Sequence, residues 1–263
     1  MKASLYAMSA LAFLILLSCS LSDKKTFHQA ENLFSKKKYE RAARLYEKAL
    51  IQIYNEKERK IIYQRLATVY HWFLYKYDKA LFYYQLFEEL AEDAQESVRA
   101  KKNIADIFQT HFKEFEKSVA MYHDILCHHS LKNEFKADIY LSLGHCHNAQ
   151  KKFSLAREAY SHVLELNPKP EIKERVQYLI GTTHFIESNY VKAIEYYNVF
   201  LKEFPYGKYS EKAMLNRAKA FEENGDLKEA LLAYDKVIER NPTLNVVRMK
   251  VDQVRKRLAV RGL

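Results

Sequence analysis

A tyrosine recurs at a nearly constant interval along most of this 263-residue sequence. Successive copies stand 38, 38, 38, 37 and 37 residues apart. The six residues are Tyr46, Tyr84, Tyr122, Tyr160, Tyr197 and Tyr234. A fixed interval of about 20 to 50 residues is typical of proteins that stack copies of one small structural unit. The chain is therefore restricted to folds in which each unit packs mainly on its neighbours.

Small and aromatic residues recur in the same register as the tyrosines. Four residues before each tyrosine stands a small residue: Ala42, Ala80, Ser118, Ala156, Ala193 or Ala230. An apolar ring or a leucine precedes that residue by three: Tyr39, Tyr77, Phe115, Phe153, Tyr190 or Leu227. A second small residue recurs further upstream: Ala30, Ala67, Ala105, Gly144, Gly181 or Ala218. Small residues allow two helices to cross closely, so each copy is predicted to be a pair of packed helices.

The composition agrees with long helices and short connections. The sequence contains only five glycines and four prolines, too few for a fold with many tight turns. Pro168, Pro205 and Pro242 follow the predicted second helices, where proline ends a helix without breaking its interior. The predicted fold is all-α, an α-solenoid of about six helical hairpins over residues 26–244.

The order small, aromatic, small, aromatic is found six times between about residues 24 and 242, and a proline follows it in three of the copies; this pattern resembles the tetratricopeptide repeat. This resemblance implies a solenoid whose first helices line a concave groove that binds peptides or proteins. Aligned on the upstream small residue, the groove side chains would be Phe34, Trp72, Arg99, Lys102, Leu141, Arg175, Tyr178, Phe185, Lys212 and Lys219. This mixture of aromatic and basic residues suits a peptide with acidic and apolar side chains.

Residues 245–263 form a seventh segment without a partner helix. Val247, Val251, Val254 and Leu258 share one helical stripe, and the basic residues lie mostly off it. The last hairpin of a solenoid needs a helix with a polar outer side to cover its apolar face. We therefore predict a C-terminal capping helix, and no nucleic-acid role for its basic residues.

The N-terminal residues predict export. Lys2, an apolar run to Leu17 and small residues at Ser18 and Cys19 are typical of a secretory signal peptide over residues 1–18, and the run is short for a membrane span. The tetrapeptide ending in Cys19 resembles the bacterial lipobox, which implies acylation (including palmitate) of Cys19. The alternative is ordinary signal cleavage next to an incidental cysteine. Under the usual Gram-negative sorting rule, Ser20 favours the outer membrane, on its periplasmic face.

The predicted tether, residues 19–25, is short. It would hold the first hairpin close to the lipid headgroups, because so few residues span at most about 25 Å. Lys24, Lys25, Lys36, Lys37 and Lys38 would then lie near an anionic leaflet. A solvated lysine turn with no membrane contact is the alternative reading of these residues.

Motifs of catalysis are missing from the sequence. It has no His-Glu-x-x-His, no Gly-x-Ser-x-Gly and no glycine-rich phosphate loop, so we predict no enzyme and no cofactor. Cysteines and histidines concentrate at Cys127–His129 and His145–His147. Side chains two apart on a helix point to different sides, so we predict no metal site. Cys127 and Cys146 are predicted to be offset too far along their helices for a disulfide.

The segment FLKEFPYGKYSEKAMLNRAKAF, residues 200–221, resembles the junction between repeats in outer-membrane lipoproteins of the BamD and CpoB types. Pro205 and Gly207 would form its turn, and Ser210 would cap the next helix. The resemblance implies a scaffold for outer-membrane protein assembly. Peptidoglycan and cell-division coordination, or pilus or secretion assembly, are alternatives, and a glycan- or ligand-binding envelope protein is a more distant one. The net charge of +10 leaves the choice of anionic partner open.

Overall fold

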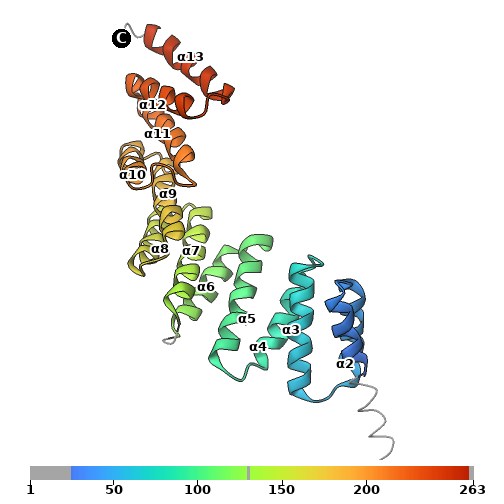
Figure 1. The fold of residues 1–263 in the computed structure, drawn as a ribbon. Helices are drawn as coiled ribbons and strands as arrows, with labels where there is room; N and C mark the ends of the chain where they lie inside the picture. The colour runs from blue at the N-terminus through green and yellow to red at the C-terminus, as the bar shows by residue number, and fades with distance from the viewer. Residues whose placement is uncertain (1–24, 129–130, 261–263) are drawn as a thin grey trace, which may run out of the picture. The chain divides into compact units, whose positions relative to one another are not determined.

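The computed structural model describes residues 25–128 and 131–260, and every regular element in these ranges is a helix (Figure 1). The all-α prediction is confirmed for this part of the chain. The predicted signal peptide, Cys19 and Lys24 lie outside it, as does His129. Among the described helices, none combines the length and the apolar character that crossing a bilayer requires.

The chain divides into two compact units, with the boundary after His128. The first unit contains a helical stretch over residues 25–35 and then five named elements. These are α2 (Tyr39–Gln52), α3 (Glu56–Trp72), α4 (Tyr77–Glu89), α5 (Ala94–Ile107) and α6 (Phe115–Leu126). A π-helical turn, η1 (Phe108–Phe112), extends α5.

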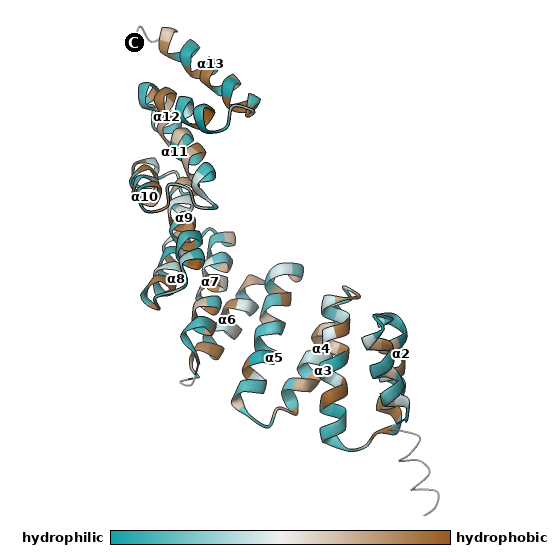
Figure 2. Ribbon diagram, in the orientation of Figure 1, coloured by the Kyte–Doolittle hydropathy of each residue, from teal (hydrophilic) through white to brown (hydrophobic). Residues whose placement is uncertain are grey.

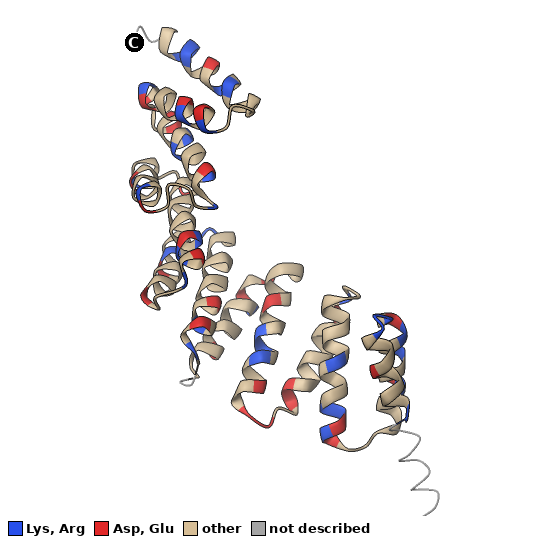
Figure 3. Cartoon of the chain, in the orientation of Figure 1, with Lys and Arg blue, Asp and Glu red and all other residues tan. Residues whose placement is uncertain are grey.

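The second unit contains seven helices in its described residues. They are α7 (Asn133–Ala149), α8 (Phe153–Glu165), α9 (Pro170–Ile186), α10 (Tyr190–Glu203), α11 (Ser210–Asn224), α12 (Leu227–Arg240) and α13 (Asn245–Val260). Consecutive helices pair as antiparallel hairpins. We call the stretch 25–35, α3, α5, α7, α9 and α11 the first helices, and α2, α4, α6, α8, α10 and α12 the second helices. Hydrophilic and hydrophobic residues are interspersed along these helices (Figure 2), and lysine, arginine, aspartate and glutamate are distributed over both units (Figure 3).

Every hairpin turn places one residue in the left-handed region, two positions before the second helix begins. The backbone φ there is 57° at Lys37, 54° at Tyr75, 59° at Lys113, 60° at Lys151, 64° at Ser188 and 89° at Gly225. Only the last of these is glycine, the residue that occupies this region without steric cost. The turn geometry is therefore imposed by packing of the hairpin and not by the residue in the turn.

The six recurring tyrosines are buried at equivalent places in the second helices, each at most 3% exposed. Each hydroxyl reaches a polar side chain on the first helix of its own hairpin. The bonds run from Tyr46 to Glu31 (2.5 Å), Tyr84 to His71 (3.4 Å), Tyr122 to Asp106 (2.6 Å), Tyr160 to His145 (3.1 Å), Tyr197 to Thr182 (3.2 Å) and Tyr234 to Glu222 (2.7 Å). Each buried hydroxyl is thereby satisfied, as burial requires.

The small residues lie where the tyrosine rings cross the first helices. A methyl group at Gly144 would overlap Cε1 of Tyr160, and one at Gly181 would lie 3.0 Å from Cε1 of Tyr197. Ala42, Ala80, Ser118, Ala156, Ala193 and Ala230 are fully buried on the second helices. The predicted role of the small residues at helix crossings is thus what the structure shows.

The final helix, α13, packs on α12 through Val247, Val251 and Val254, which are buried. A carboxylate on α11 also holds α13. Glu222, 5% exposed, accepts hydrogen bonds from Arg257 at 2.9 Å and from Lys250 at 3.5 Å. The apolar stripe and these two cations together fix α13 over the last hairpin.

In the junction between α10 and α11, the predicted helix cap at Ser210 is wrong. Ser210 is the first residue of α11 and does not cap it, because its hydroxyl donates to the carbonyl of Phe204 at 2.6 Å. Gly207 leaves room for a buried side chain of the previous first helix. A methyl group there would overlap the Glu174 carboxylate, whose Oε1 accepts from the backbone N–H of Tyr209 at 2.7 Å.

Candidate functional site

Polar side chains connect successive first helices within the first unit. Arg65 on α3 donates to both carboxylate oxygens of Glu31, at 2.8 and 3.2 Å. Lys60 on α3 donates to Glu96 on α5 at 3.0 Å. These charge-assisted contacts place the first helices of neighbouring hairpins side by side along one surface.

In the second unit an arginine and a histidine make the equivalent connection. Arg175 on α9 lies 3.2 Å from Nε2 of His145 on α7. Arginine can only donate, so Nε2 accepts and the proton resides on Nδ1, which donates to the Tyr160 hydroxyl. Burial and the nearby Arg175 charge lower the pKa of His145 to about 4, so the ring is neutral at pH 7.

The next connection, between α9 and α11, is made by an amide and two phenols. The Asn216 side chain donates to the hydroxyls of Tyr178 at 3.1 Å and Tyr197 at 3.4 Å. The Tyr178 ring also stacks on Tyr209 from the preceding junction, with centroids 5.0 Å apart. This surface is therefore ordered by side-chain bonds before any partner binds, which lowers the entropic cost of binding.

A cavity of about 230 Å³ opens between α3 and α5 in the first unit. It brings together two of the predicted groove residues, Trp72 and Arg99, with Gln64 and Asn103 beside them. Trp72 is 57% exposed and stacks on His71, with ring centroids 4.2 Å apart. An exposed indole beside a guanidinium is a combination often found at the energetic centres of protein interfaces.

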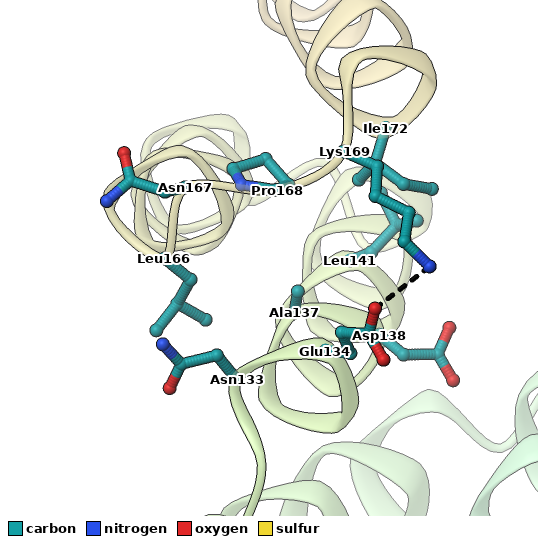
Figure 4. Close-up of a pocket in the computed structure, with 10 residues that line it drawn as sticks. All are labelled: Asn133, Glu134, Ala137, Asp138, Leu141, Leu166, Asn167, Pro168, Lys169 and Ile172. Carbon is teal, nitrogen blue, oxygen red and sulfur yellow. Dashed lines mark ion pairs between the residues drawn. The ribbon is translucent and has the colours of Figure 1, made fainter.

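A larger cavity of about 530 Å³ lies between the start of α7, the end of α8 and the start of α9 (Figure 4). Its apolar lining is Ala137, Leu141, Leu166, Pro168 and Ile172, and its polar lining is Asn133, Glu134, Asp138, Asn167 and Lys169. Lys169 forms an ion pair with Glu134 at 2.9 Å across one edge. Both cavities adjoin first helices, so each unit offers a hollow on the surface described above.

Three of the predicted groove residues are partly or almost wholly buried. Leu141 is 5% exposed and belongs to the core, where it lines the larger cavity. Phe34 and Phe185 are partly buried and contact the second helices of their own hairpins, with centroids 5.7 Å from the rings of Tyr39 and Tyr190 respectively. Burial against the second helix removes part of each ring from water.

The remaining predicted groove residues differ in their surroundings. Arg99 and Lys212 are exposed, and Lys219 is partly buried. Lys102 forms an ion pair with Asp106 at 2.8 Å on its own helix. Arg175 and Tyr178 make the helix-to-helix contacts given above. Trp72 and Arg99 share one cavity, and the others are distributed along the first helices of the two units.

The basic residues predicted to face lipid are exposed where the structure describes them. Lys25 lies at the start of the first helical stretch, and Lys36, Lys37 and Lys38 form the first hairpin turn. Their membrane contact stays a prediction.

The predicted cysteine and histidine cluster falls in both units. Cys127, at the end of α6 in the first unit, is exposed, whereas Cys146, in α7 of the second unit, is buried, and the two are not joined by a disulfide. Within the described ranges no group of three or more histidine, cysteine, aspartate or glutamate side chains is arranged to hold a metal ion.

Sequence reasoning did not identify Glu174, Tyr209 or Asn216, which organise the surface of the second unit. Their contacts join residues up to 38 positions apart, across neighbouring hairpins. The register of the repeat could have pointed to Glu174. This carboxylate stands seven residues before Gly181, and the equivalent residue of the previous hairpin is the apolar Ala137.

Comparison with known families supports this architecture. Residues 170–251 match the model of the family YfiO, described as outer membrane lipoprotein. Residues 137–170 match a tetratricopeptide repeat model. No curated protein matches the sequence. The chain thus resembles tetratricopeptide-repeat lipoproteins of the BamD type, as the sequence motifs predicted.

Solved structures share the fold at low sequence identity. The C-terminal part of a tetratricopeptide repeat-containing protein from Cytophaga hutchinsonii is 22% identical, with a TM-score of 0.62 over 81% of this chain and 78% of that chain. PilW, a type IV pilus biogenesis factor, is 15% identical, with a TM-score of 0.58 over 87% and 98%. YrrB, a tetratricopeptide protein with an unusual peptide-binding site, is 18% identical, with a TM-score of 0.55 over 78% and 96%. The predicted fold class is confirmed.

Proposed function

We propose that this protein is a non-enzymatic scaffold of the bacterial cell envelope, anchored through acylated Cys19, which binds segments of other envelope proteins on its first helices. The match of residues 170–251 to an outer membrane lipoprotein family is the observation that carries this proposal. The lipobox-like tetrapeptide ending at Cys19 supports the anchor independently, since it lies outside the matched region.

The surface of the first helices supports a binding role over a catalytic one. Its polar residues are engaged in contacts between helices, as with Arg65 to Glu31 and Arg175 to His145. Its hollows contain an exposed Trp72 and a basic Arg99, which suit a peptide side chain. No set of nucleophile, base and oxyanion donor converges among the described residues of either cavity. Assembly of outer-membrane proteins is the pathway we favour, because it is the role that the resemblance to BamD-type lipoproteins implies.

The anchor is tested by metabolic labelling with a palmitate analogue in a Gram-negative host. Wild-type chain is expected to incorporate label and fractionate with the outer membrane, while Cys19→Ala is expected to lose both. Label on the Cys19→Ala protein, or an unlabelled wild-type chain in the cytosol, would contradict the anchor.

The binding surface is tested by site-specific photocrosslinking in cells. A photoreactive residue at Trp72 on α3 is compared with one at Phe82 on α4, because the two side chains are 57% and 54% exposed in the same unit. Crosslinks to an envelope protein from position 72 but not position 82 are expected. Recovery of a barrel-assembly component supports the favoured pathway, a cell-wall or pilus component replaces it, and crosslinks to glycan alone reject the scaffold.

A further inference from the structure

The larger cavity lies where α7 carries Ala137, at a position from which two other first helices, α3 and α9, reach the next hairpin. Seven residues before the small residue of a first helix, α3 carries Lys60 and α9 carries Glu174. Lys60 reaches Glu92 at 3.3 Å and Glu96 at 3.0 Å, and Glu174 accepts from the backbone of Tyr209 at 2.7 Å. The equivalent position on α7 is Ala137, whose methyl group cannot span to the next hairpin.

A second position contributes to the same space. Three residues before the small residue, α9 carries Tyr178, whose ring stacks on Tyr209. The equivalent residue on α7 is Leu141, and the segment between α8 and α9 contains no aromatic residue to stack on it. The junction that Glu174, Tyr178 and Tyr209 fill in one hairpin is thus left as a cavity of about 530 Å³ in the preceding one.

The lining of this cavity specifies the chemistry of an occupant. Ala137 and Leu141, 7% and 5% exposed, form its floor together with Leu166 and Ile172, so the floor favours an apolar side chain. Glu134 and Asp138 stand at the edge against the single cation Lys169, which gives the lining a net negative charge (Figure 4). The Lys169 and Glu134 side chains are 71% and 76% exposed, so their ion pair is weak and exchangeable.

We propose that this cavity binds a peptide segment in which an apolar side chain stands next to a lysine or arginine. The apolar side chain would cover Ala137 and Leu141, and the cation would pair with the carboxylates of Asp138 and Glu134. This inference deepens the proposed scaffold function and rests on it. The cavity would therefore favour a basic peptide, whereas the basic residues predicted along the groove favour an acidic one.

The test uses the full-length chain in detergent and a fluorescein-labelled nonapeptide, Ser-Gly-Ser-Leu-Lys-Leu-Arg-Gly-Ser, followed by fluorescence anisotropy. One matched peptide replaces both cations with glutamate, and another replaces both leucines with serine. Each replacement is expected to weaken binding at least about tenfold, because one removes the ionic contact and the other the apolar one.

The matched protein variants use the neighbouring hairpins as guides. Ala137→Lys introduces the side chain that α3 has at this position, so it should fold, fill the cavity and weaken binding about tenfold or more. Asp138→Asn should weaken binding about threefold to tenfold by removing one carboxylate. Glu195→Gln, at an exposed position on α10, should leave binding unchanged. Circular dichroism melts of the three variants verify that each is folded.

The possible results separate this inference from the scaffold proposal. Equal binding to folded Ala137→Lys, equal binding of the glutamate peptide, or no binding of the leucine-lysine peptide to wild type overturns the occupant proposed here. The crosslinks from position 72 would still support the scaffold in that case. Conversely, selective peptide binding without any cellular crosslink from position 72 supports the cavity and counts against the proposed function.

Discussion

At the scale of single residues, Gly144 has less room for a methyl group than Gly181, the other glycine among the recurring small residues. Added methyl groups in a packed core cost about 1–3 kcal/mol, whereas replacing glycine by alanine within a helix favours folding by about 1 kcal/mol. The overlap at Gly144 involves a buried ring that cannot move freely, while the contact at Gly181 is only tight. At Gly144 the cost of overpacking should therefore exceed the gain in helix propensity, whereas at Gly181 the two should nearly cancel.

We expect Gly144→Ala to lower the free energy of unfolding by up to about 2 kcal/mol, because overpacking exceeds the helix-propensity gain. Gly181→Ala serves as the matched variant and should be close to neutral. Urea denaturation followed by circular dichroism measures both. A Gly144→Ala protein at least as stable as wild type would show that the Tyr160 ring has room to shift.

His145 predicts a pH dependence of stability. Its pKa in the folded chain is about 4, below the ordinary value of 6.5, so the unfolded chain binds the proton more tightly. The contribution of neutral His145 is fully present above about pH 6.5 and is lost as the pH falls toward 4. Its magnitude is on the order of 1–3 kcal/mol.

Between pH 7 and 4.5, His145→Gln should therefore lose less stability than wild type, since glutamine has no proton to gain. Denaturation midpoints at several pH values measure this difference, and His123→Gln, at an exposed position, is the control. Parallel pH profiles of His145→Gln and wild type would contradict the assigned protonation state.

The sequence predicted the buried tyrosines and small residues because their spacing repeats. It did not predict the hydroxyl partners, which differ in type and lie 12 to 16 residues away, as with Glu222 and Asp106. The burial of Phe34 and Phe185 was also not predictable from the sequence. Aromatic residues on a first helix serve equally well in the hairpin interior and at a surface, and only packing distinguishes the two.

At the scale of elements, all six hairpin turns place a residue in the left-handed region, although that residue is a lysine, a tyrosine, a serine or a glycine. A non-glycine residue in the left-handed region costs about 1 kcal/mol relative to glycine. No neighbouring atom lies within 4 Å of a methyl group built on Gly225, so its backbone conformation alone determines the effect of substitution there.

Lys151→Gly should accordingly raise the free energy of unfolding by up to about 1 kcal/mol, and Gly225→Ala should lower it by a similar amount. The two variants change the same structural position in opposite directions, so each controls for the other. Thermal and urea denaturation measure both changes. Shifts of the same sign would mean that the turn conformation does not limit stability.

The helices themselves were predictable because their apolar periodicity and prolines agree. Pro168, Pro205 and Pro242 follow α8, α10 and α12 as expected. The left-handed turns were not predictable, since lysine, tyrosine and serine rarely indicate that conformation. Ser210 was assigned as a cap on residue type alone, and the carbonyl of Phe204 competed for its hydroxyl.

At the scale of the whole molecule, the first hairpin turn is the place where the anchor and the folded chain would meet the membrane. Lys36, Lys37 and Lys38 are exposed there, and each cation near an anionic leaflet contributes about 1 kcal/mol. We expect a Cys19→Ala chain to sediment with liposomes containing anionic lipid, and the Lys36, Lys37 and Lys38 to glutamate variant to lose most of this association.

A reversal of three exposed lysines on α11 and α12, Lys212, Lys228 and Lys236, applies the same change in net charge elsewhere and should have a smaller effect. Sedimentation in low and high salt measures the electrostatic share. If the Lys36, Lys37 and Lys38 variant still sediments with the liposomes as the parent chain does, this turn does not contact the membrane.

The pairing of each recurring tyrosine with the first helix of its own hairpin limits how such a gene can change in length. Recombination that inserts or deletes one complete hairpin moves each tyrosine together with its hydrogen-bond partner, so no hydroxyl loses its partner. A breakpoint inside a hairpin would separate the phenol from its hydrogen-bond partner and leave a buried polar atom without a partner. The array should therefore gain or lose length only in whole helical pairs.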